Sequence, residues 1–196
     1  GIGSTTLTAT QAANGNYAST TANITLTVTA ATPTLSGFAL SSSSVVYGAS
    51  APTITAPTSP SSGALSYTSS NTAVATVSGS TITIVGIGTT TFTATQAANG
   101  NYGSASTTTT LTVTAATPTL TTSLSATSVV YASTAPTLSY TSNSSGAVTY
   151  TSSNTAVATV SGSTITIVGV GSTTFTATQA ANGNYSSATA TTNLTV

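Results

Sequence analysis

The side chains that carry out most protein chemistry are missing from this sequence of 196 residues. It contains no Asp, Glu, His, Lys, Arg, Cys, Met or Trp. The hydroxyls of Ser, Thr and Tyr and the amides of Asn and Gln are the reactive groups that remain. None of them is a general acid or base near neutral pH, so no group can activate a Ser or Thr nucleophile. The composition therefore predicts that the protein is not an enzyme and has no catalytic residues.

Metal, cofactor and nucleic-acid binding are restricted by the same absence. Zinc sites are built from Cys, His or carboxylate ligands, and dedicated calcium sites depend on carboxylates. Neutralising nucleic-acid phosphates requires Lys or Arg. We therefore expect no metal site, no cofactor-binding residues and no nucleic-acid partner. Salt bridges and disulfides are likewise excluded as sources of stability.

The remaining composition is polar but uncharged. Ser and Thr together account for 85 residues, and hydrophobic residues make up 38%. No apolar run approaches the roughly 18 residues of a membrane-spanning helix, so we expect no membrane span in this segment. A chain rich in Ser and Thr and free of Cys also fits a disordered, mucin-like stalk. The regular spacing of the apolar residues argues against that alternative.

An internal repeat organises the chain. The string QAANGNY begins at Gln11, Gln96 and Gln179, and Thr68–Tyr102 recurs as Thr151–Tyr185 with two substitutions. A period near 84 residues suits a tandem array of small domains rather than a solenoid. Because the sequence opens inside a repeat, we expect the full gene product to contain further copies. The predicted divisions are the last two strands of a partial repeat at 1–29, a full repeat at 30–114 and a second at 115–196.

Apolar residues within a repeat alternate with Thr, which indicates β-strands. Phe92 and Ala94 share one face of their run, as do Leu111 and Val113, and Thr occupies the opposite face. Ser-Gly-Ser and Asn-Gly pairs between the runs are hairpin signals. The fold class is therefore predicted to be all-β, with tandem immunoglobulin-like antiparallel sandwiches. About seven strands are expected per repeat: Thr34–Leu40, Ser44–Tyr47 with Pro52–Ala56, Ala64–Thr68, Ala73–Val77, Thr81–Val85, Thr89–Thr95 and Ser104–Thr114.

The order of these motifs resembles the bacterial immunoglobulin-like domains found in tandem in surface adhesins. The matching stretches are Tyr67–Asn71, Val74–Val77, Gly79–Ile84 and Gly88–Thr95, and they recur 83 residues later. The resemblance implies a core aromatic at Tyr67 and Tyr150, where the family commonly has Trp. It also implies an extracellular or cell-surface location, because family members are usually spacers that hold an adhesive tip away from the cell.

The function that we favour from the sequence is structural and non-enzymatic. Tandem uncharged repeats would form an extracellular filament, fibre or stalk, and self-association with identical chains is the expected partnership, since uncharged surfaces do not repel one another. One alternative is an adhesin repeat region that binds glycans or surfaces through Tyr, Asn and Thr. A more remote alternative is ice binding by outward arrays, which include Thr91, Thr93, Thr95, Thr108, Thr110 and Thr112.

Two further features carry expectations. The QAANGNY strings are interpreted as hairpin loops whose Tyr packs at the end of a sandwich, although ligand binding stays open. Glycan modification is also possible, on exposed Ser and Thr or at the Asn-X-Ser/Thr triplets that begin at Asn23, Asn143, Asn184 and Asn193.

The partial repeat should not stand alone. A two-stranded hairpin is marginally stable in water, and Leu7, Ile24 and Leu26 would be bare on one face. We expect either a preceding part of the same chain or another molecule to complete it.

Overall fold

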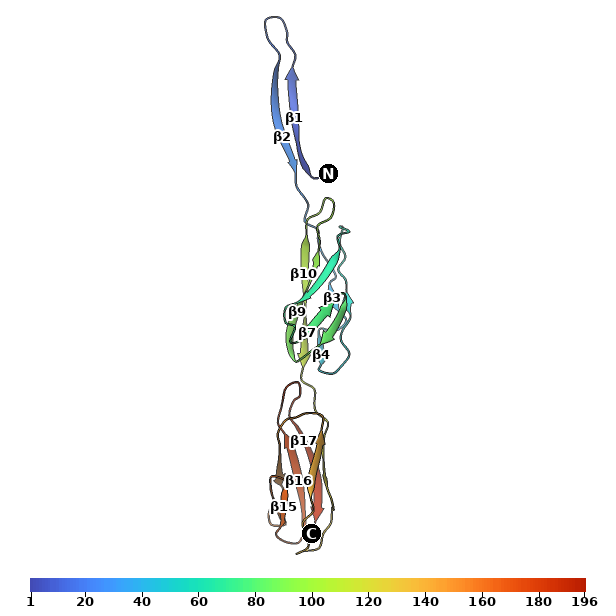
Figure 1. The fold of residues 1–196 in the computed structure, drawn as a ribbon, viewed down its shortest axis with the longest axis vertical. Helices are drawn as coiled ribbons and strands as arrows, with labels where there is room; N and C mark the ends of the chain where they lie inside the picture. Colours follow the sequence, from blue (N-terminus) through green and yellow to red (C-terminus); the bar gives the residue numbers. More distant parts are fainter. The chain divides into compact units, whose positions relative to one another are not determined.

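The computed structural model describes residues 1–196 and contains only β-strands (Figure 1). The chain divides into two compact units. Unit 1 comprises residues 1–43, 51–83 and 89–111, and unit 2 comprises residues 44–50, 84–88 and 112–196. Two short segments of the first repeat, 44–50 and 84–88, therefore belong to the same unit as the second repeat. No helix is long and apolar enough to cross a membrane.

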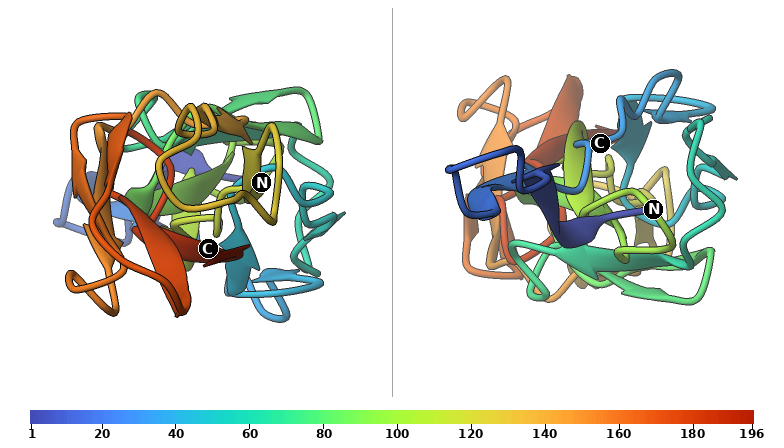
Figure 2. Two further views of the ribbon diagram at one scale, coloured as in Figure 1. Left: turned by 90° about the horizontal axis from the view of Figure 1, so that it is seen from below. Right: turned by 90° about the horizontal axis from the view of Figure 1, so that it is seen from above.

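The second repeat is a sandwich of seven strands. One layer is an antiparallel sheet of β13 (Val148–Ser152), β16 (Ser172–Gln179) and β17 (Ala188–Thr195), in that order. The other layer consists of two antiparallel pairs, β11 (Leu120–Leu124) with β12 (Leu138–Ser142) and β14 (Ala158–Ser161) with β15 (Thr164–Ile167). The gold segment that contains β11 and β12, the orange segment that contains β14 and β15 and the dark red β17 can be followed by colour in Figure 2 (left).

The core of the second repeat lies between these layers. Leu138, Ala158 and Ile165 face it from one layer, and Phe175 and Leu194 face it from the other. Phe175 and Leu194 are fully buried because each lies on the inward side of a strand whose alternate residues are Thr or Asn. Alternation with Thr therefore produces the buried face that the sequence predicts.

The first repeat has a similar plan, with a fourth strand in its main sheet and a shorter first strand pair. Its main sheet has the order β4 (Ser44–Val46), β10 (Ala105–Thr114), β9 (Gly88–Gln96) and β6 (Leu65–Ser69), with β4 parallel to β10. Two pairs complete it: β3 (Ala39–Leu40) with β5 (Ile54–Thr55), and β7 (Ala75–Ser78) with β8 (Thr81–Ile84). The buried apolar residues are Val74, Ala75, Ile82, Phe92, Ala94, Leu111 and Val113.

The first strand of this repeat is much shorter than the predicted Thr34–Leu40. Only Ala39 and Leu40 pair as a strand, whereas β11 of the second repeat pairs over five residues. Gly37 has a φ of 77°, which interrupts the extended backbone, and the facing segment contains Pro57 and Pro60, which have no N–H to donate. A single bridge between Ser36 and Thr58 is what remains of the pairing there.

The resemblance to the bacterial domains placed the core aromatic at Tyr67 and Tyr150. Both tyrosines are half-buried, and the fully buried aromatics are Phe92 and Phe175 on the neighbouring strands. Tyr67 stacks on Phe38 with ring centroids 5.8 Å apart, and Tyr150 packs against the edge of the second core. The tyrosines therefore flank the core, because the inward Phe already occupies its centre.

Residues 1–29 form the hairpin of β1 (Gly3–Gln11) and β2 (Thr20–Val28), drawn in blue in Figure 1. In the register of this pair, Leu7 lies opposite Ile24, and Leu26 and Val28 share their face. The other face carries only Ser, Thr and Asn. Every residue of both strands is exposed in the single chain, so the apolar face is bare. Its completion by another segment or molecule stays a prediction.

Candidate functional site

A buried glutamine closes one end of each sandwich. The Gln179 side chain is fully buried, and its Nε2 donates to the carbonyl oxygens of Ser144 and Gly146 at 2.9 and 3.0 Å. Its Oε1 accepts a hydrogen bond from Ser142 Oγ at 2.7 Å. The amide therefore satisfies two carbonyl oxygens of the loop that precedes β13 and the Ser142 hydroxyl at the end of β12. Gln96 repeats this arrangement in the first repeat, with Ser59, Ser61 and Gly63.

The loop held by this glutamine approaches the backbone so closely that it requires glycine. A Cβ built on Gly146 would lie 2.0 Å from the carbonyl oxygen of Ala180, and one built on Gly63 would lie 1.9 Å from that of Ala97. The contacted atoms belong to backbone and cannot turn aside as a flexible side chain would. The Ser-Ser-Gly sequence before β6 and β13 is therefore a packing requirement, not only a flexible turn.

A buried threonine organises a second polar cluster at the other end of the same strand. Thr173 on β16 is buried; its Oγ1 lies 2.7 Å from Ser152 Oγ and accepts a hydrogen bond from the Asn154 N–H at 3.0 Å. Ser152 Oγ also donates to the carbonyl oxygen of Ala158 at 2.7 Å. The Ser-Ser-Asn motif thus joins the two layers through hydroxyl groups. Thr90 makes the same contacts with Ser69 and Asn71 in the first repeat.

The three QAANGNY strings form the same small turn. Asn99 and Tyr102 exchange two backbone hydrogen bonds around Gly100 and Asn101, as do the equivalent residues of the other two copies. Gly100 has a φ of 57°, and Asn101 has no positive φ. A positive φ at the first central residue alone is typical of a type II′ turn. The structure therefore has the predicted hairpin loops at all three strings, but the predicted packing of their Tyr is not found at Tyr17, which is exposed, whereas Tyr102 and Tyr185 are half-buried.

The segment that enters each full repeat is tied to that loop. Ala116 donates its N–H to the Asn184 carbonyl at 3.0 Å and accepts a hydrogen bond from the Ser186 N–H at 2.9 Å. Ala31 makes the same pair of bonds with Asn101 and Gly103. Pro33 and Pro118, which follow two residues later, are buried. Backbone hydrogen bonds therefore hold the first residues of each full repeat in place, and the proline that follows restricts the backbone further.

The remaining features that the sequence singled out lie at the surface. Thr91, Thr93 and Thr95 on β9 lie on the outward face, opposite the buried Phe92 and Ala94. Of the four Asn-X-Ser/Thr triplets, Asn23, Asn143 and Asn193 are exposed, whereas Asn184 is half-buried.

Equivalent shallow hollows occur in both repeats. One of about 290 Å³ lies against β5 and β8 and is lined by Ala51–Ile54 and Ser80–Ile82. The other, of about 390 Å³, is lined by Thr134–Leu138 and Ser163–Ile165. Their walls consist of apolar and hydroxyl side chains without any charged group, so we expect a polar ligand to bind weakly there.

Sequence reasoning missed the burial of Gln96, Gln179, Thr90 and Thr173. The available signal was the two-residue period: Thr90, Phe92, Ala94 and Gln96 alternate along one strand, so all four face the same side. A polar residue at each end of an inward row indicates a buried hydrogen-bonding site at each end of the sandwich.

Comparison with known proteins yields neither a matching family model nor a matching curated protein. Solved structures similar to this chain include Drosophila N-cadherin EC1-4, at 12% identity and a TM-score of 0.37, covering 91% of this chain and 53% of that one. A SusE-like surface-located polysaccharide-binding protein from the Bacteroides thetaiotaomicron heparin utilisation locus has 16% identity and a TM-score of 0.30, covering 87% and 35%. Surface layer protein SbsC, domains 1–6, has 17% identity and a TM-score of 0.28, covering 100% and 35%. The chain therefore spans about half or about a third of the length of these proteins.

Proposed function

We propose that this chain is a non-enzymatic structural protein that forms part of an extracellular filament, fibre or stalk. The observation that carries the proposal is the recurrence, in both repeats, of two buried polar clusters built only from amide and hydroxyl groups. The clusters centre on Gln96 and Thr90 in the first repeat and on Gln179 and Thr173 in the second. They take the place that ion pairs, disulfides or metals occupy in many small domains.

Such a fold suits a structural role outside the cell. No interaction that stabilises it depends on ionic strength, metal supply or redox state, because its side chains include no charged group and no Cys. An enzyme or a selective receptor would gain nothing from losing all charged residues. A load-bearing polymer gains a core and surface that stay unchanged as its surroundings change. The resemblance of the repeat motifs to bacterial surface domains supports the same role and location.

Electron microscopy of the native material tests this proposal. We expect threads with a regular axial repeat, and antibodies raised against residues 115–196 should label them along their length. Labelling confined to the cell interior, or a dispersed protein with no association with any thread, would contradict a structural role. Measuring the same sample in buffers from low to high salt adds a check, since the threads should persist unchanged.

A second candidate function is binding of glycans or surfaces by the repeats themselves. The observation that favours it is the exposure of the aromatic rings of Tyr17, Tyr131 and Tyr140. A glycan array probed with the purified chain tests it. Saturable binding that is lost in the Tyr140→Ser variant would favour this candidate over a purely mechanical role, provided that a control variant keeps the binding. The control replaces an exposed Thr of the other sheet without changing the free energy of unfolding.

A further inference from the structure

The QAANGNY loop of each full repeat contains an asparagine followed by a glycine, at Asn99-Gly100 and Asn182-Gly183. This pair allows a reaction that needs no acid, base or nucleophilic side chain. The glycine backbone nitrogen attacks the side-chain carbonyl carbon of the asparagine, because glycine has no Cβ to hinder the approach. A C–N bond forms, and the side-chain amide nitrogen leaves as ammonia with the proton of the glycine N–H. Water then opens the resulting succinimide ring to aspartate or isoaspartate, so an amide becomes a carboxylate.

The backbone of the turn holds the glycine nitrogen away from this carbon. Asn99 and Tyr102 form an antiparallel β-bridge, in which the Tyr102 N–H donates to the Asn99 carbonyl oxygen at 3.1 Å. Ring closure requires the glycine nitrogen and the side-chain carbon to lie on the same side of the Cα–C bond, whereas extended backbone points them apart. The Asn99 carbonyl and the Gly100 nitrogen belong to one planar peptide unit, so they rotate together. The attack therefore has to break the hydrogen bond from Tyr102.

A serine holds the side-chain amide in addition. Asn99 Nδ2 donates to Ser62 Oγ at 3.1 Å, and this nitrogen is the one that must leave. Ser62 lies between Ser61 and Gly63, whose carbonyl oxygens both accept hydrogen bonds from the buried Gln96 amide. The serine cannot follow the amide as the ring closes, because its neighbours on both sides are fixed at the closed end of the sandwich.

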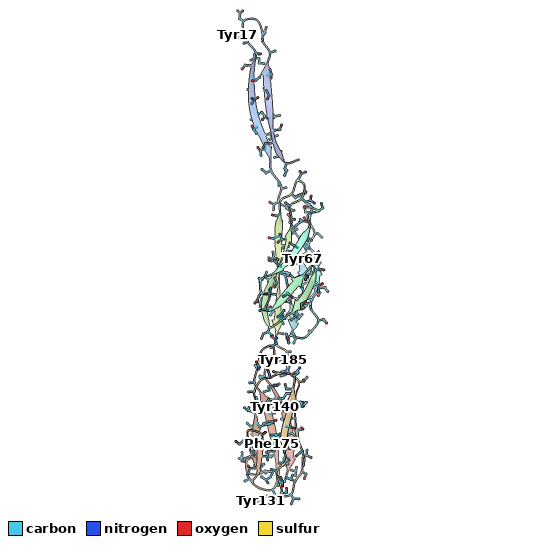
Figure 3. The ribbon with its side chains drawn as sticks, in the orientation of Figure 1. Tyr17, Tyr67, Tyr131, Tyr140, Phe175 and Tyr185 are labelled. Carbon is cyan, nitrogen blue, oxygen red and sulfur yellow. The ribbon has the colours of Figure 1, made fainter.

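The second repeat has the same arrangement. Asn182 Nδ2 donates to Ser145 Oγ at 3.1 Å, and Asn182 and Tyr185 exchange backbone hydrogen bonds of 3.1 and 3.0 Å. Figure 3 shows Tyr185 at one end of the second sandwich, whose interior contains Phe175. Both loops therefore combine a reactive pair with hydrogen bonds that oppose its reaction.

We propose that Asn99 and Asn182 are deamidation sites that the fold protects, with Ser62 and Ser145 as the residues that position their side-chain amides. Each asparagine stays an amide while its turn is closed and converts to aspartate or isoaspartate once the turn opens. The inference concerns a chemical modification of the chain and does not depend on the proposed structural function.

Conversion has consequences for the segment that enters the repeat. Ala31 is held by its hydrogen bonds to Asn101 and Gly103, which follow the reactive asparagine. Isoaspartate carries the backbone through the former side chain and lengthens it by one atom, which displaces these partners. Either product also places a carboxylate in a sequence that has no charged side chain. Protection of the amide therefore preserves both the anchored entry segment and the neutral surface.

Deamidation rates at the two sites test the proposal in the full chain. The protein is incubated in mildly alkaline buffer, then denatured and digested with thermolysin, which cleaves before large apolar residues. The fragments Phe92–Thr110 and Phe175–Asn193 contain one Asn-Gly pair each and differ in mass, because the residues after Tyr102 and Tyr185 differ. Mass spectrometry of these fragments gives the converted fraction of each site over time. We expect both sites to react more slowly in the folded chain than in urea.

Ser62→Ala removes the partner of Asn99 alone. We expect deamidation at Asn99 to rise about two- to tenfold, as for the loss of one hydrogen bond, while the rate at Asn182 in the same molecule stays constant. Ser145→Ala should give the reverse. Ser62→Thr keeps a hydroxyl at this position and should keep the slow rate. Ser104→Ala, which alters an exposed serine just after the same loop, is the matched control and should leave both rates unchanged.

These measurements separate a local hold from a general loosening of the fold. A rise at both sites in either alanine variant, together with a lower urea midpoint, would attribute the effect to global unfolding and contradict the local role of the serine. Unchanged rates in both alanine variants, or equal rates in the folded and the unfolded chain, would overturn the proposal. Electron microscopy of the native material decides the structural role independently of these results.

Discussion

At the scale of single residues, an uncharged interior depends on a few amides and hydroxyls that cannot be replaced by apolar groups. Gln179 satisfies two carbonyl oxygens and one hydroxyl in a site without access to water. A buried polar group that loses its partner costs about 1–3 kcal/mol. Part of the stability of each repeat therefore depends on side chains that a hydropathy profile would assign to the surface.

Replacing Gln179 by Leu should destabilise the second repeat by about 2–4 kcal/mol, because three polar groups lose their partner at once. Urea unfolding followed by circular dichroism measures the change. Gln11→Leu is the matched control: it begins the same heptapeptide, but its side chain is exposed, so the midpoint should stay constant. Equal effects of the two variants would show that the buried amide contributes no more than an exposed one.

Replacing Gly146 by Ala should also destabilise the second repeat, by about 1–3 kcal/mol or more, since the added methyl group overlaps the Ala180 carbonyl oxygen. The loop must shift, and the hydrogen bonds from Gln179 to this loop weaken with it. Gly103→Ala is the control, because the nearest atom to its Cβ lies at 3.8 Å, and Ser186 occupies the equivalent position in the second repeat. Thermal unfolding that ranks the two variants in the opposite order would contradict the close approach.

Tyr150 offers a change in the opposite direction. Its hydroxyl is buried and has no hydrogen-bonding partner in the protein. Tyr150→Phe removes that group while keeping the ring against the core, so the second repeat should be unchanged or more stable by up to about 1 kcal/mol. Tyr140→Phe, at an exposed ring, should have no effect on the free energy of unfolding. A loss of stability in Tyr150→Phe alone would show that the hydroxyl is satisfied.

At the scale of elements, equivalent sequence leads to different environments. Leu7 and Leu26 occupy the positions of the buried Phe92 and Leu111 in the repeat, yet both are exposed. Residues 1–29 supply only two strands of a sandwich, and no other segment of residues 1–196 buries their apolar side. Burial is thus decided by the presence of the second layer and not by the strand itself.

The β1–β2 hairpin should therefore be the least protected element in the monomer. Hydrogen exchange followed by mass spectrometry at low protein concentration should show rapid exchange over residues 3–28 and slow exchange over β16 and β17. The reason is that a two-stranded hairpin without a packed face opens easily. Slow exchange of both elements in a sample shown to be monomeric would contradict this expectation, and slowing that appears only on association would indicate that a partner covers the hairpin.

At the scale of the whole molecule, the absence of ionisable side chains makes stability insensitive to pH. Folding stability depends on pH only through groups that bind different numbers of protons in the folded and unfolded states. No Asp, Glu, His, Cys, Lys or Arg is present to contribute such a difference.

The unfolding midpoint should consequently move by no more than a few degrees between about pH 3 and pH 9, since no Asp, Glu, His, Cys, Lys or Arg side chain is present to bind or release a proton. It should be equally insensitive to sodium chloride at concentrations that only screen charges. Differential scanning calorimetry across both series measures this. A larger shift with pH would reveal charged groups added after synthesis, and enzymatic removal of glycans or phosphate from the sample would identify them.

Local patterns in the sequence were sufficient to predict the strands, the turns and the repeats. Alternation of Thr with Phe, Ala, Leu and Val indicated the strands and their buried faces, and Gly after Asn or Ser marked the tight turns, because both signals act between near neighbours in the chain. The recurrence of QAANGNY likewise located the repeats, since a repeated string can be read directly along the chain.

Features formed by segments that are distant in the sequence became visible in the folded chain alone. It showed that Gln96 and Gln179 are buried, that Gly63 and Gly146 lie against a backbone carbonyl, and that Pro57 and Pro60 shorten the first strand pair of one repeat. It also showed that the Tyr47 ring contacts the Tyr185 ring, which lies far away in the sequence. These outcomes are set by which partner lies opposite a residue in space, and a local pattern carries no information about that partner.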